Sequence, residues 1–520
     1  GGLMQLVAYG AQDKDLTSNP QITFFKLVHR RYSNFAVEAI EQTHTGSCDF
    51  GRRVSCAISR NGDLMSRVYV QATLPSVEQK SAGKGSWIEN VGQFLVREAE
   101  LEIGGQRIDR QYGQWMMIWN ELAGSHTGEA GFNRMIGNED IMTNSGAESW
   151  TFKVAGENAS TGTLNGYAME FAGKKYKKDE VGTVTYAELV DMYMNQGSTG
   201  PKWPTAGNLY KRLAANDETG EPAKWSTEDA SVVAADDAGD VEDIRKAMTA
   251  GNGFAGTKKT FPTRELLIPL NFWFCKNPGL ALPLLALQYH EVKVNVTFEG
   301  FDKLWNGVDA RGVIDETVTG TRDGGLDCKF WVDYLYLDNE ERTRMASDQH
   351  EYLIEQVQYT GEESCMQSTN RFKLNFNHPC KELVWVINPS NRRLGDFEYP
   401  DMEDSNPVKT AKMTLNGHER FKERPGYYFD CVQPYQHHSR CPPNRGINVY
   451  SFALNPEEHQ PSGTCNFSRI DNSLLEIKTH NTSNNCATDE YYCNAKAHIY
   501  TTNYNTLRIM SGLGGLKFSN

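Results

Sequence analysis

The chain has 520 residues, of which 39% are hydrophobic and 11% aromatic, so it holds enough apolar surface for sizeable cores and is not globally disordered. It carries 66 acidic and 53 basic residues, a net charge of −13, which argues against a nucleic-acid coat and against binding to an anionic membrane surface. The longest apolar run, Leu280 to Leu287, has eight residues and is far too short to span a membrane. The length indicates two to four domains, at roughly 100–200 residues per domain.

Much of the negative charge lies in one segment. From Ala214 to Asp243 there are ten acidic residues and one basic residue. Burying so many unpaired charges would be prohibitively costly, so this segment must lie on the surface.

Cysteine usage favours a reducing compartment. The chain has 11 cysteines, an odd number, and no C-x-x-C pair. This pattern predicts buried thiols and argues against a secreted disulfide framework.

Two short helices are expected. The first should run from Gln21 to Arg31, because Asn19 and Pro20 are a favourable N-cap and first-turn pair. The second should begin after Asp338, where acidic residues in the first turn and arginines further on suit the helix dipole.

Alternation of apolar and polar residues is the dominant pattern of the chain. The clearest runs are Val54–Ile58, Val68–Leu74, Val292–Phe298 and Phe372–Phe376. Each run has the period of a half-buried strand and is bounded by Gly, Asn, Asp or Pro. Short strands of this kind predict an antiparallel sandwich.

Three short matches occur in the same order in both halves of the chain, which indicates an internal duplication. They are Ile-Glu-Gln at 40–42 and 354–356, tight hairpin turns at 104–105 and 416–417, and Glu-Val-Lys or Glu-Ile-Lys at 291–293 and 476–478.

The spacing of these matches locates an insertion. Ile40 and Leu101 are 61 residues apart, and their counterparts are 59 apart. From Leu101 to Glu291 the distance is 190 residues, against 63 in the second half. The surplus of 127 residues falls between about 130 and 260, where the composition becomes rich in Gly, Ala, Asp and Glu. Insertions this long are usually exposed or functional.

Candidate chemical sites are weak. Residues Gly251 to Gly256 have phosphate-loop spacing, but Thr257 and Lys258 stand in the reverse of the required order. A glycosidase on such a scaffold would need a pair of carboxylates facing a cleft. With 66 acidic residues, some two carboxylates always lie close together, and the sequence does not identify any pair as catalytic. No catalytic residue and no cofactor are therefore predicted.

One cluster has residue types that can bind zinc. Cys431, His437, His438 and Cys441 lie within eleven residues, but their spacing matches no common zinc module. Prolines around them mark a turn-rich segment, so a hydrogen-bonded loop against the sandwich is the favoured interpretation, and no metal is predicted.

Four glycosylation sequons are present, at Asn158, Asn295, Asn466 and Asn481. Asn295 falls in an expected strand and is a poor acceptor. Asn158 lies in the exposed insertion and is the best candidate.

Longer blocks of sequence carry a resemblance to a known family. They are residues 2–13, 19–26, 58–64, 269–274, 277–284, 415–418, 432–435, 446–454, 461–469 and 514–520. These blocks resemble the major capsid proteins of nucleocytoplasmic large DNA viruses. They cover both halves of the chain and leave out the insertion.

The resemblance implies an all-β double jelly roll, with two consecutive eight-stranded antiparallel jelly rolls, a long loop insertion in the first and few short helices. The expected division is an N-terminal arm at 1–25, a first jelly roll at 26–337 with the insertion at about 130–260, a linker helix at 338–350 and a second jelly roll at 351–520.

The resemblance also implies a structural function and no enzyme activity. Such chains form homotrimeric, pseudo-hexagonal capsomers that tile an icosahedral shell, assembled in the host cytoplasm. The implied partners are the chain itself, minor capsid proteins beneath the shell and a cap or host-surface partner at the insertion, without direct nucleic-acid contact or membrane insertion. The alternative is a carbohydrate-binding or carbohydrate-active jelly roll that uses its long loops as a binding site.

Overall fold

The structure is a computed structural model. It describes residues 1–143, 260–480 and 495–518, apart from gaps at 81–84, 125–128, 309–313, 316–319, 366, 390–391 and 398–405, and between 144 and 259 it describes only short strands.

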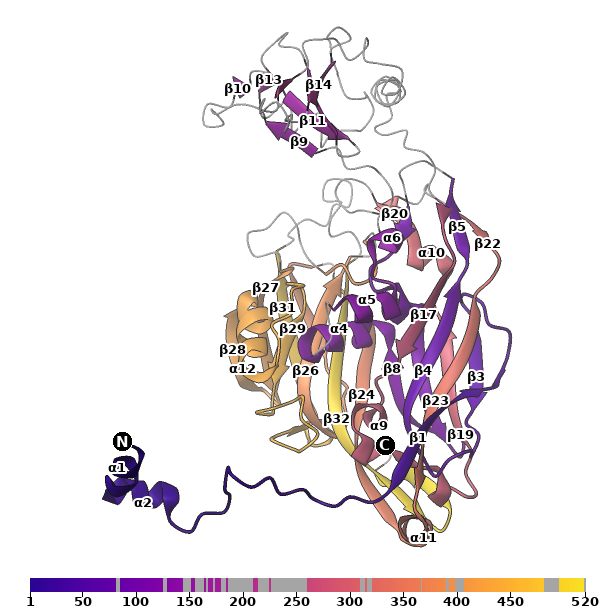
Figure 1. Cartoon of the computed structure of the whole chain (residues 1–520). Coiled ribbons are helices and arrows are strands. Elements are labelled where there is room, and N and C mark those ends of the chain that lie inside the picture. Colours follow the sequence, from indigo (N-terminus) through magenta and orange to yellow (C-terminus); the bar gives the residue numbers. More distant parts are fainter. Residues whose placement is uncertain are drawn as a thin grey trace.

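The first half of the chain forms two facing antiparallel sheets (Figure 1). The first sheet contains, in order, β1 (Phe35–Gln42), β23 (Asp327–Leu337), β4 (Leu64–Leu74) and β17 (Arg264–Pro269). The second contains β3 (Arg53–Ala57), β19 (Val292–Phe298), β7 (Val96–Ile103) and β8 (Gln106–Tyr112), with β2 (His44–Thr45) beside β3. The alternating runs predicted at Val54, Val68 and Val292 are the strands β3, β4 and β19.

The second half repeats this arrangement. One sheet contains β24 (His350–Ser364), β32 (Lys496–Met510), β26 (Pro379–Asn388) and β29 (Asn448–Ser451), in this order. The other contains β25 (Thr369–Lys373), β31 (Ser473–Thr479), β27 (Val408–Leu415) and β28 (His418–Pro425). In both halves the first, eighth, third and sixth strands form one sheet, and the second, seventh, fourth and fifth form the other. The predicted pair of eight-stranded jelly rolls is confirmed.

The hairpins of the repeat are equivalent in detail. The turn residues Gly104 and Gly105 have φ of 58° and 84°, and Asn416 and Gly417 have 48° and 83°. Positive φ at both central residues is what a type I′ hairpin requires. The pairing of β7 with β8 shifts by one residue just beyond the turn, and the pairing of β27 with β28 shifts at the same place.

One of the three sequence matches is a coincidence. Ile103 pairs with Val292, whereas its counterpart Leu415 pairs with Ser473. The tripeptides at 291–293 and 476–478 are therefore four residues out of register, although the strands that contain them are equivalent.

Helices and short strands fill the connections of the first jelly roll. Between β8 and β17 the chain forms α4 (Gly113–Ala123), α5 (Ala130–Ile136) and α6 (Asp140–Thr143) before the insertion and β16 (Thr260–Phe261) after it. Other short elements include β5 (Ser76–Gln79), β6 (Ser86–Trp87), α3 (Val91–Leu95), α9 (Trp273–Lys276), β18 (Leu282–Pro283), α10 (Phe301–Leu304), β20 (Trp305–Val308), β21 (Ile314–Asp315) and β22 (Gly320–Asp323).

The insertion was expected to be a loop, but it includes antiparallel strands. One set contains β15 (Lys224–Trp225), β14 (Leu209–Leu213), β12 (Lys174–Lys178), β11 (Tyr167–Phe171) and β9 (Thr151–Val154), and a second pairs β10 (Thr163–Leu164) with β13 (Val184–Thr185).

The helix predicted over 21–31 is absent, and this prediction was wrong. The N-terminal segment instead forms α1 (Gly2–Val7) and α2 (Ala11–Thr17), and residues 20–34 are not helical. Phe24 and Phe25 are 88% and 97% exposed, so the segment packs against nothing. A short helix in water is marginal without such packing, particularly one that begins with aromatic and β-branched residues.

The second predicted helix is confirmed as α11 (Asn339–Ser347). The Asp338 carboxylate accepts a hydrogen bond from the Glu341 backbone N–H at 3.0 Å, as expected of an N-cap. The helix buries none of its residues, so the cap and exposed contacts such as the 3.1 Å ion pair of Arg342 with Asp63 stabilise it.

Replacing Asp338 by alanine is expected to lower the free energy of unfolding by about 1 kcal/mol, the usual cost of a lost N-cap. Urea unfolding of the variant would measure this change. Asp338→Asn serves as the control, because an amide oxygen still caps, and it should lie close to the parent chain. Equal loss in both variants would contradict a capping role.

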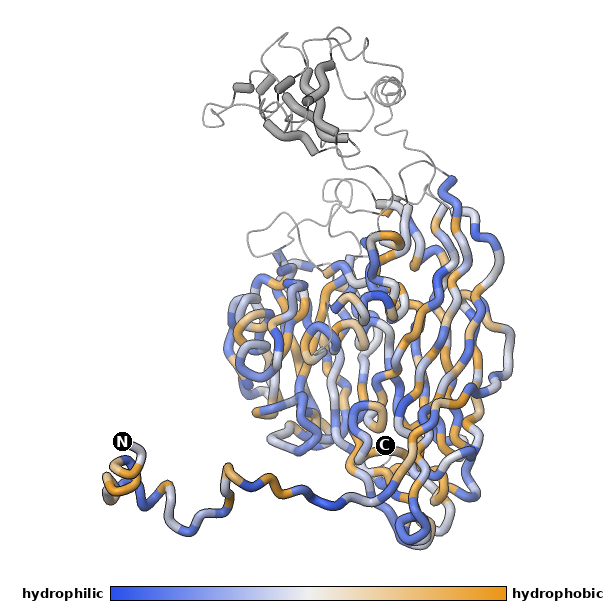
Figure 2. The backbone as a smooth tube through the Cα atoms, viewed as in Figure 1, coloured by the Kyte–Doolittle hydropathy of each residue, from blue (hydrophilic) through white to orange (hydrophobic). Residues whose placement is uncertain are grey.

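The sheet β24–β32–β26–β29 is buried on both faces and forms the centre of the molecule. Along β26, Leu383, Trp385 and Ile387 face a core inside the second jelly roll, whereas Val384 and Val386 belong to a larger core shared with the first jelly roll. Figure 2 shows apolar positions running through both halves of the folded body. One apolar core is thus shared by the two jelly rolls, and the second jelly roll has a further core of its own.

The structure differs from the cysteine prediction at one pair. Cys48, in the segment after β2, forms a disulfide with Cys328 of β23, with a Cα–Cα distance of 6.1 Å. These residues are 280 positions apart, so only the packing of the two sheets brings them together. Cys56, Cys365 and Cys380 are buried free thiols, as expected.

Candidate assembly surfaces

The junction between the two jelly rolls is polar at its edge. Strand β24 packs along β8, where the Gln356 side-chain amide donates to the Ile108 carbonyl oxygen. The Val357 backbone N–H donates to the Asp109 carboxylate at 3.1 Å. Asp109 is 3% exposed, and burial raises its pKa to about 6 even though Gln111 also donates to it.

An ion cluster lies deeper in the junction. The Glu355 carboxylate is 2.8 Å from Lys381 Nζ, 3.1 Å from Lys276 Nζ and 3.3 Å from His459 Nδ1. Lys276 belongs to α9 of the first jelly roll and Lys381 to β26 of the second. Burial opposes ionisation of Glu355, but the charges of the two lysines and the hydrogen bond with His459 outweigh it and hold its pKa well below the usual range.

Helix α4 forms the third part of the junction. The Tyr500 hydroxyl donates to Gln114 Oε1 at 2.6 Å, and the Tyr500 ring lies 5.5 Å from that of Trp115. Trp115 and Trp119 are 2% and 9% exposed. Hydrogen bonds, buried charges and aromatic packing together make the two jelly rolls one rigid block.

The sequence analysis did not predict these junction residues, although the sequence of β26 contains a pattern that indicates them. Leu383 to Ile387 is a continuous apolar run, which is typical of a strand buried on both faces. Lys381 and Glu382 directly precede it, and charged residues in such a strand must have buried partners.

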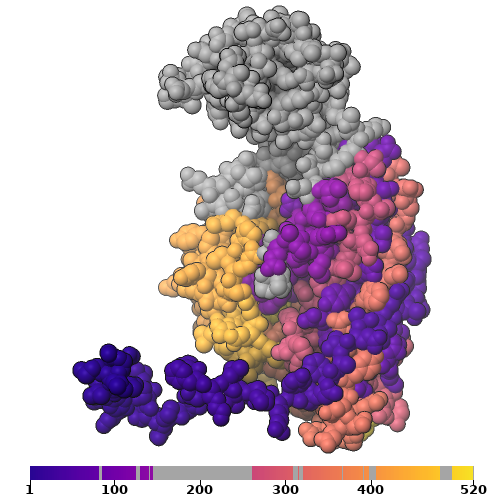
Figure 3. Space-filling model, viewed as in Figure 1, coloured from indigo at the N-terminus to yellow at the C-terminus, as the bar shows by residue number. Residues whose placement is uncertain are grey.

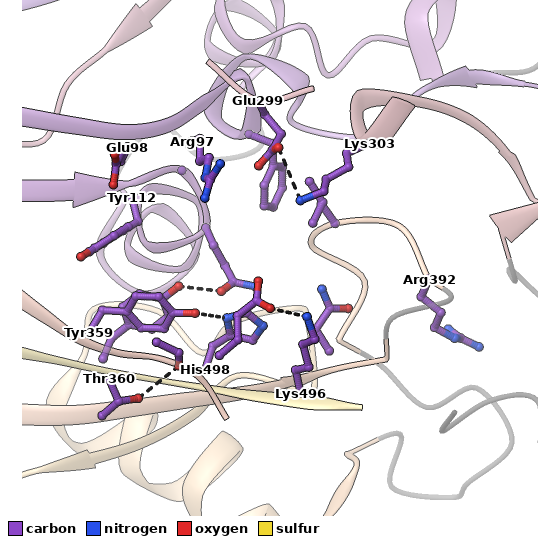
Figure 4. Close-up of a pocket in the computed structure, with 18 of the residues that line it drawn as sticks. Arg97, Glu98, Tyr112, Glu299, Lys303, Tyr359, Thr360, Arg392, Lys496 and His498 are labelled. Atoms are coloured by element: carbon purple, nitrogen blue, oxygen red, sulfur yellow. Dashed lines mark hydrogen bonds and ion pairs between the residues drawn. The ribbon is translucent and has the colours of Figure 1, made fainter. Parts of the chain in front are cut away.

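A cavity of about 660 Å³ opens beside the junction. Figure 4 shows Tyr359, His498 and Lys496 grouped on one wall, with Glu299 and Lys303 opposite. The Tyr359 hydroxyl lies 2.6 Å from His498 Nδ1, and burial lowers the pKa of His498 to about 4.

The charged groups of this cavity are mostly paired with one another. Lys496 forms an ion pair with Glu362, and Lys303 with Glu299 at 3.5 Å. His498 is neutral at physiological pH and bound to a tyrosine. Each of these pairs lies within one jelly roll, and the arrangement does not group an activated nucleophile with a base.

The cysteine–histidine cluster is hydrogen-bonded, but the loop that the sequence favoured is wrong for part of it, because Cys431 lies in a helical segment at Tyr428–Val432 and His437 ends α12 (Gln433–His437). His438 lies between two carboxylates, 3.0 Å from Glu382 and 3.0 Å from Glu457, and His437 Nδ1 lies 2.9 Å from the Leu454 carbonyl oxygen. In the described part of the chain, no group of three or more His, Cys, Asp or Glu side chains could hold a metal ion.

Other sequence candidates are only partly placed. The phosphate-loop-like segment 251–256 and the sequons at Asn158 and Asn481 lie outside the described residues, so glycosylation at Asn158 stays a prediction. Asn295 is buried in β19, where its side chain bonds Ser55 and Glu102, which agrees with its being a poor acceptor.

The N-terminal segment projects from the base of the body (Figure 3). Residues 1–39 are all exposed, including Phe24, Phe25 and Leu27, each of which is at least 88% exposed. Apolar side chains left bare in this way indicate a surface that is covered in an assembly. Across the residues with described placement, no helix is long and apolar enough to cross a membrane.

Two fused jelly rolls with a common core and an exposed apolar arm define a double jelly-roll building block. Comparisons with known structures agree. The structure matches a chain of the quasi-atomic model of the PBCV-1 virus capsid with a TM-score of 0.61 at 30% identity, covering 96% of this chain and 100% of that one. The Faustovirus major capsid protein shares the fold, with a TM-score of 0.60 at 12% identity.

Sequence comparisons identify the family. The family model for the large eukaryotic DNA virus major capsid protein matches residues 341–515, and that for the major capsid protein N-terminus matches 23–157 and 231–338. The major capsid proteins of Phaeocystis pouchetii virus and Paramecium bursaria Chlorella virus 1 are 39% and 34% identical, with full coverage of both chains.

The chain therefore belongs to the family of major capsid proteins of large eukaryotic DNA viruses. It is a structural component of the virion capsid that assembles with itself, and its family is not an enzyme family. The N-terminal family model leaves out residues 158–230, which lie within the expected insertion.

Proposed function

We propose that this chain forms homotrimeric capsomers, each with six jelly rolls in a pseudo-hexagonal outline, that tile an icosahedral shell. The observation that supports this most is the equivalence of the two jelly rolls, which share strand order and are joined in one rigid block. Two similar domains per chain let a three-fold oligomer imitate six-fold packing.

The proposal places one end of the block on the inner side of the shell and the other end on the outer side. The arm at 1–25 lies beneath the shell and contacts minor capsid proteins, and the insertion at about 130–260 forms an outer tower that receives a cap or host-surface partner. Jelly rolls at 26–337 and 351–520, with the helix at 338–350 between them, form the wall. Assembly takes place in the host cytoplasm. The exposed apolar arm and the acidic insertion support these assignments.

Multi-angle light scattering of the purified chain tests the proposal. The expected mass is three times that of the chain. A monomer that binds a defined sugar would contradict it and favour the carbohydrate-binding alternative.

Deleting residues 1–31 is expected to leave the unfolding temperature and the trimer unchanged, because residues 1–34 are exposed and precede β1. Shell assembly should be lost, since the arm provides the contact beneath the capsomer. Calorimetry and electron microscopy of assembly reactions, with the full chain as control, would measure both. A lower unfolding temperature would show instead that the arm stabilises the body.

A further inference from the structure

Two free cysteines face each other across neighbouring strands of the second jelly roll. The short strand β30 (Cys465–Asn466) pairs with β26 in antiparallel register, and Cys380 is the direct partner of Cys465. Directly opposed residues of antiparallel strands have Cα atoms about 4.5–5.5 Å apart, within the range of about 4.4–6.8 Å that disulfides span. The backbone spacing therefore permits a bond between these two residues.

The two side chains also lie on the same face of the strands. Cys380 is 0% exposed in the core inside the second jelly roll, and Cys465 is half-buried against that same core. The Cys380 thiol contacts the backbone carbonyl oxygens of Asn377 and His378, each at 3.5 Å. A thiol is a weak hydrogen-bond donor, so little is lost when its sulfur bonds to Cys465 instead.

We propose that Cys380 and Cys465 form a second disulfide, in addition to Cys48–Cys328, and that this bond fastens the segment 452–472 to β26. The bond lies within one chain, so it does not depend on the homotrimer proposed above.

The fastened segment connects β29 with β31 and contributes to both buried charge clusters. Its Glu457 carboxylate lies 3.0 Å from His438 Nδ1, and its His459 Nδ1 lies 3.3 Å from the Glu355 carboxylate. The His459 carbonyl oxygen also accepts a hydrogen bond from the Tyr504 hydroxyl at 3.2 Å. Movement of this segment away from the body would therefore bring water to the charges of the junction.

Hydrogen bonds already hold the start of the segment beside the proposed bond. Lys381 directly follows Cys380, and its carbonyl oxygen accepts hydrogen bonds from the backbone N–H groups of Phe452 and Ala453 at 2.8 and 3.1 Å. A disulfide at Cys465 holds the far end of the same segment on the same strand. Local opening of the segment then becomes rarer, because both ends have to be released.

The half-buried thiol is the one that an oxidant reaches. Burial raises the pKa of Cys380 to about 12, and it raises the pKa of Cys465 as well, although the Arg420 guanidinium opposes the second shift. The Cys465 thiolate attacks a low-molecular-weight disulfide such as oxidised glutathione, breaks its S–S bond and releases one glutathione thiol. Cys380 then attacks the Cys465 sulfur of the mixed disulfide and releases the second.

The two steps balance without a further co-reactant. Two cysteine thiols are oxidised to one disulfide, one glutathione disulfide is reduced to two thiols, and the two cysteine protons pass to these thiols. The pair stays reduced in a reducing compartment and bonds in an oxidising one, an order of events that rests on the cytoplasmic assembly proposed above. Raised pKa values keep the thiolate fraction small, so closure should be slow.

Peptide mapping tests the bond directly. The purified full-length chain is incubated with oxidised glutathione below its unfolding temperature, then unfolded in an alkylating reagent, digested and analysed by mass spectrometry. Peptides that contain Cys380 and Cys465 should be joined, whereas Cys56 and Cys365 should be alkylated, since both are buried. A Cys465 that is alkylated, retains glutathione or is joined to a different cysteine would overturn the inference.

Thermal unfolding measures the effect of the bond. In oxidising buffer the parent chain should unfold about 3 °C or more above Cys465→Ser, because the bond restricts the unfolded chain between residues 380 and 465. In reducing buffer this gap should close. Both chains share Cys48–Cys328, so its contribution cancels within each buffer. A gap of the same size in both buffers would contradict the proposed bond.

Two further variants separate the bond from the loss of a thiol. Cys380→Ala should remove the oxidation-dependent gap as Cys465→Ser does, even where the lost side chain lowers stability in both buffers. Cys275→Ala is the matched control, since it removes a half-buried free thiol of α9, and its difference from the parent should be the same in both buffers. Light scattering keeps the two proposals apart, because a trimer without the bond would overturn only the bond, and a bonded monomer only the homotrimer.

Discussion

Replacing Glu355 by glutamine is expected to lower the free energy of unfolding by about 3–5 kcal/mol, because it leaves a buried cation without its counter-charge. Lys381 is 0% exposed and Glu355 is 7% exposed, so water cannot take over the lost interaction. Urea unfolding at neutral pH would measure the loss. The stabilisation should be present above pH 4.5 and disappear as acid protonates Glu355, since its pKa in the folded chain is lowered.

Glu351→Gln is the matched control on the same strand. Glu351 pairs with Arg508 and Lys517, but its side chain is 45% exposed, so the change should cost less than about 1 kcal/mol. Similar losses in the two variants would mean that the junction cluster is no more important than a surface pair.

Replacing His438 by alanine is expected to cost a similar amount, about 3–5 kcal/mol, because Glu382 is fully buried and would lose its cation. Burial opposes the positive charge of His438, but the carboxylates of Glu382 and Glu457 outweigh it and raise the pKa to about 9. The stabilisation should therefore be complete below about pH 6.5, the value of a free histidine, and be lost as the pH rises through about 9.

The neighbouring residue provides the control for this prediction. His437 contacts the backbone carbonyl of Leu454 at an exposed position, so His437→Ala should have little effect. Thermal unfolding from pH 6 to pH 10 would compare the two variants with the parent chain. If the parent exceeded His438→Ala by the same margin at pH 6 and pH 10, the ion pair would not be the source of the stability.

Local features of this fold were readable from the sequence because neighbouring residues determine them. Alternation predicted β3, β4 and β19, since one face of each strand packs on a core and the other does not. Asp338 capped α11 as predicted, through an atom three residues from its donor. Gly-Gly and Asn-Gly predicted the two hairpins because their backbones accept positive φ.

Predictions failed or were missing where distant contacts decide the outcome. The helix expected over 21–31 lacks a packing partner, and a cap alone does not hold it together. The Glu-Val-Lys match looked like part of the repeat, yet strand pairing places it four residues out of register. A short tripeptide match carries too little information to define register.

The sequence by itself determined that this protein is a duplicated all-β chain with a long acidic insertion and the family blocks of a capsid protein. Only the tertiary structure decided which sheet became central, which cysteines met across 280 residues and which charges were buried together around Glu355 and His438. The physical reason is that strand alternation and turn chemistry act within a few residues. Burial on a second face, by contrast, depends on which part of the chain arrives there.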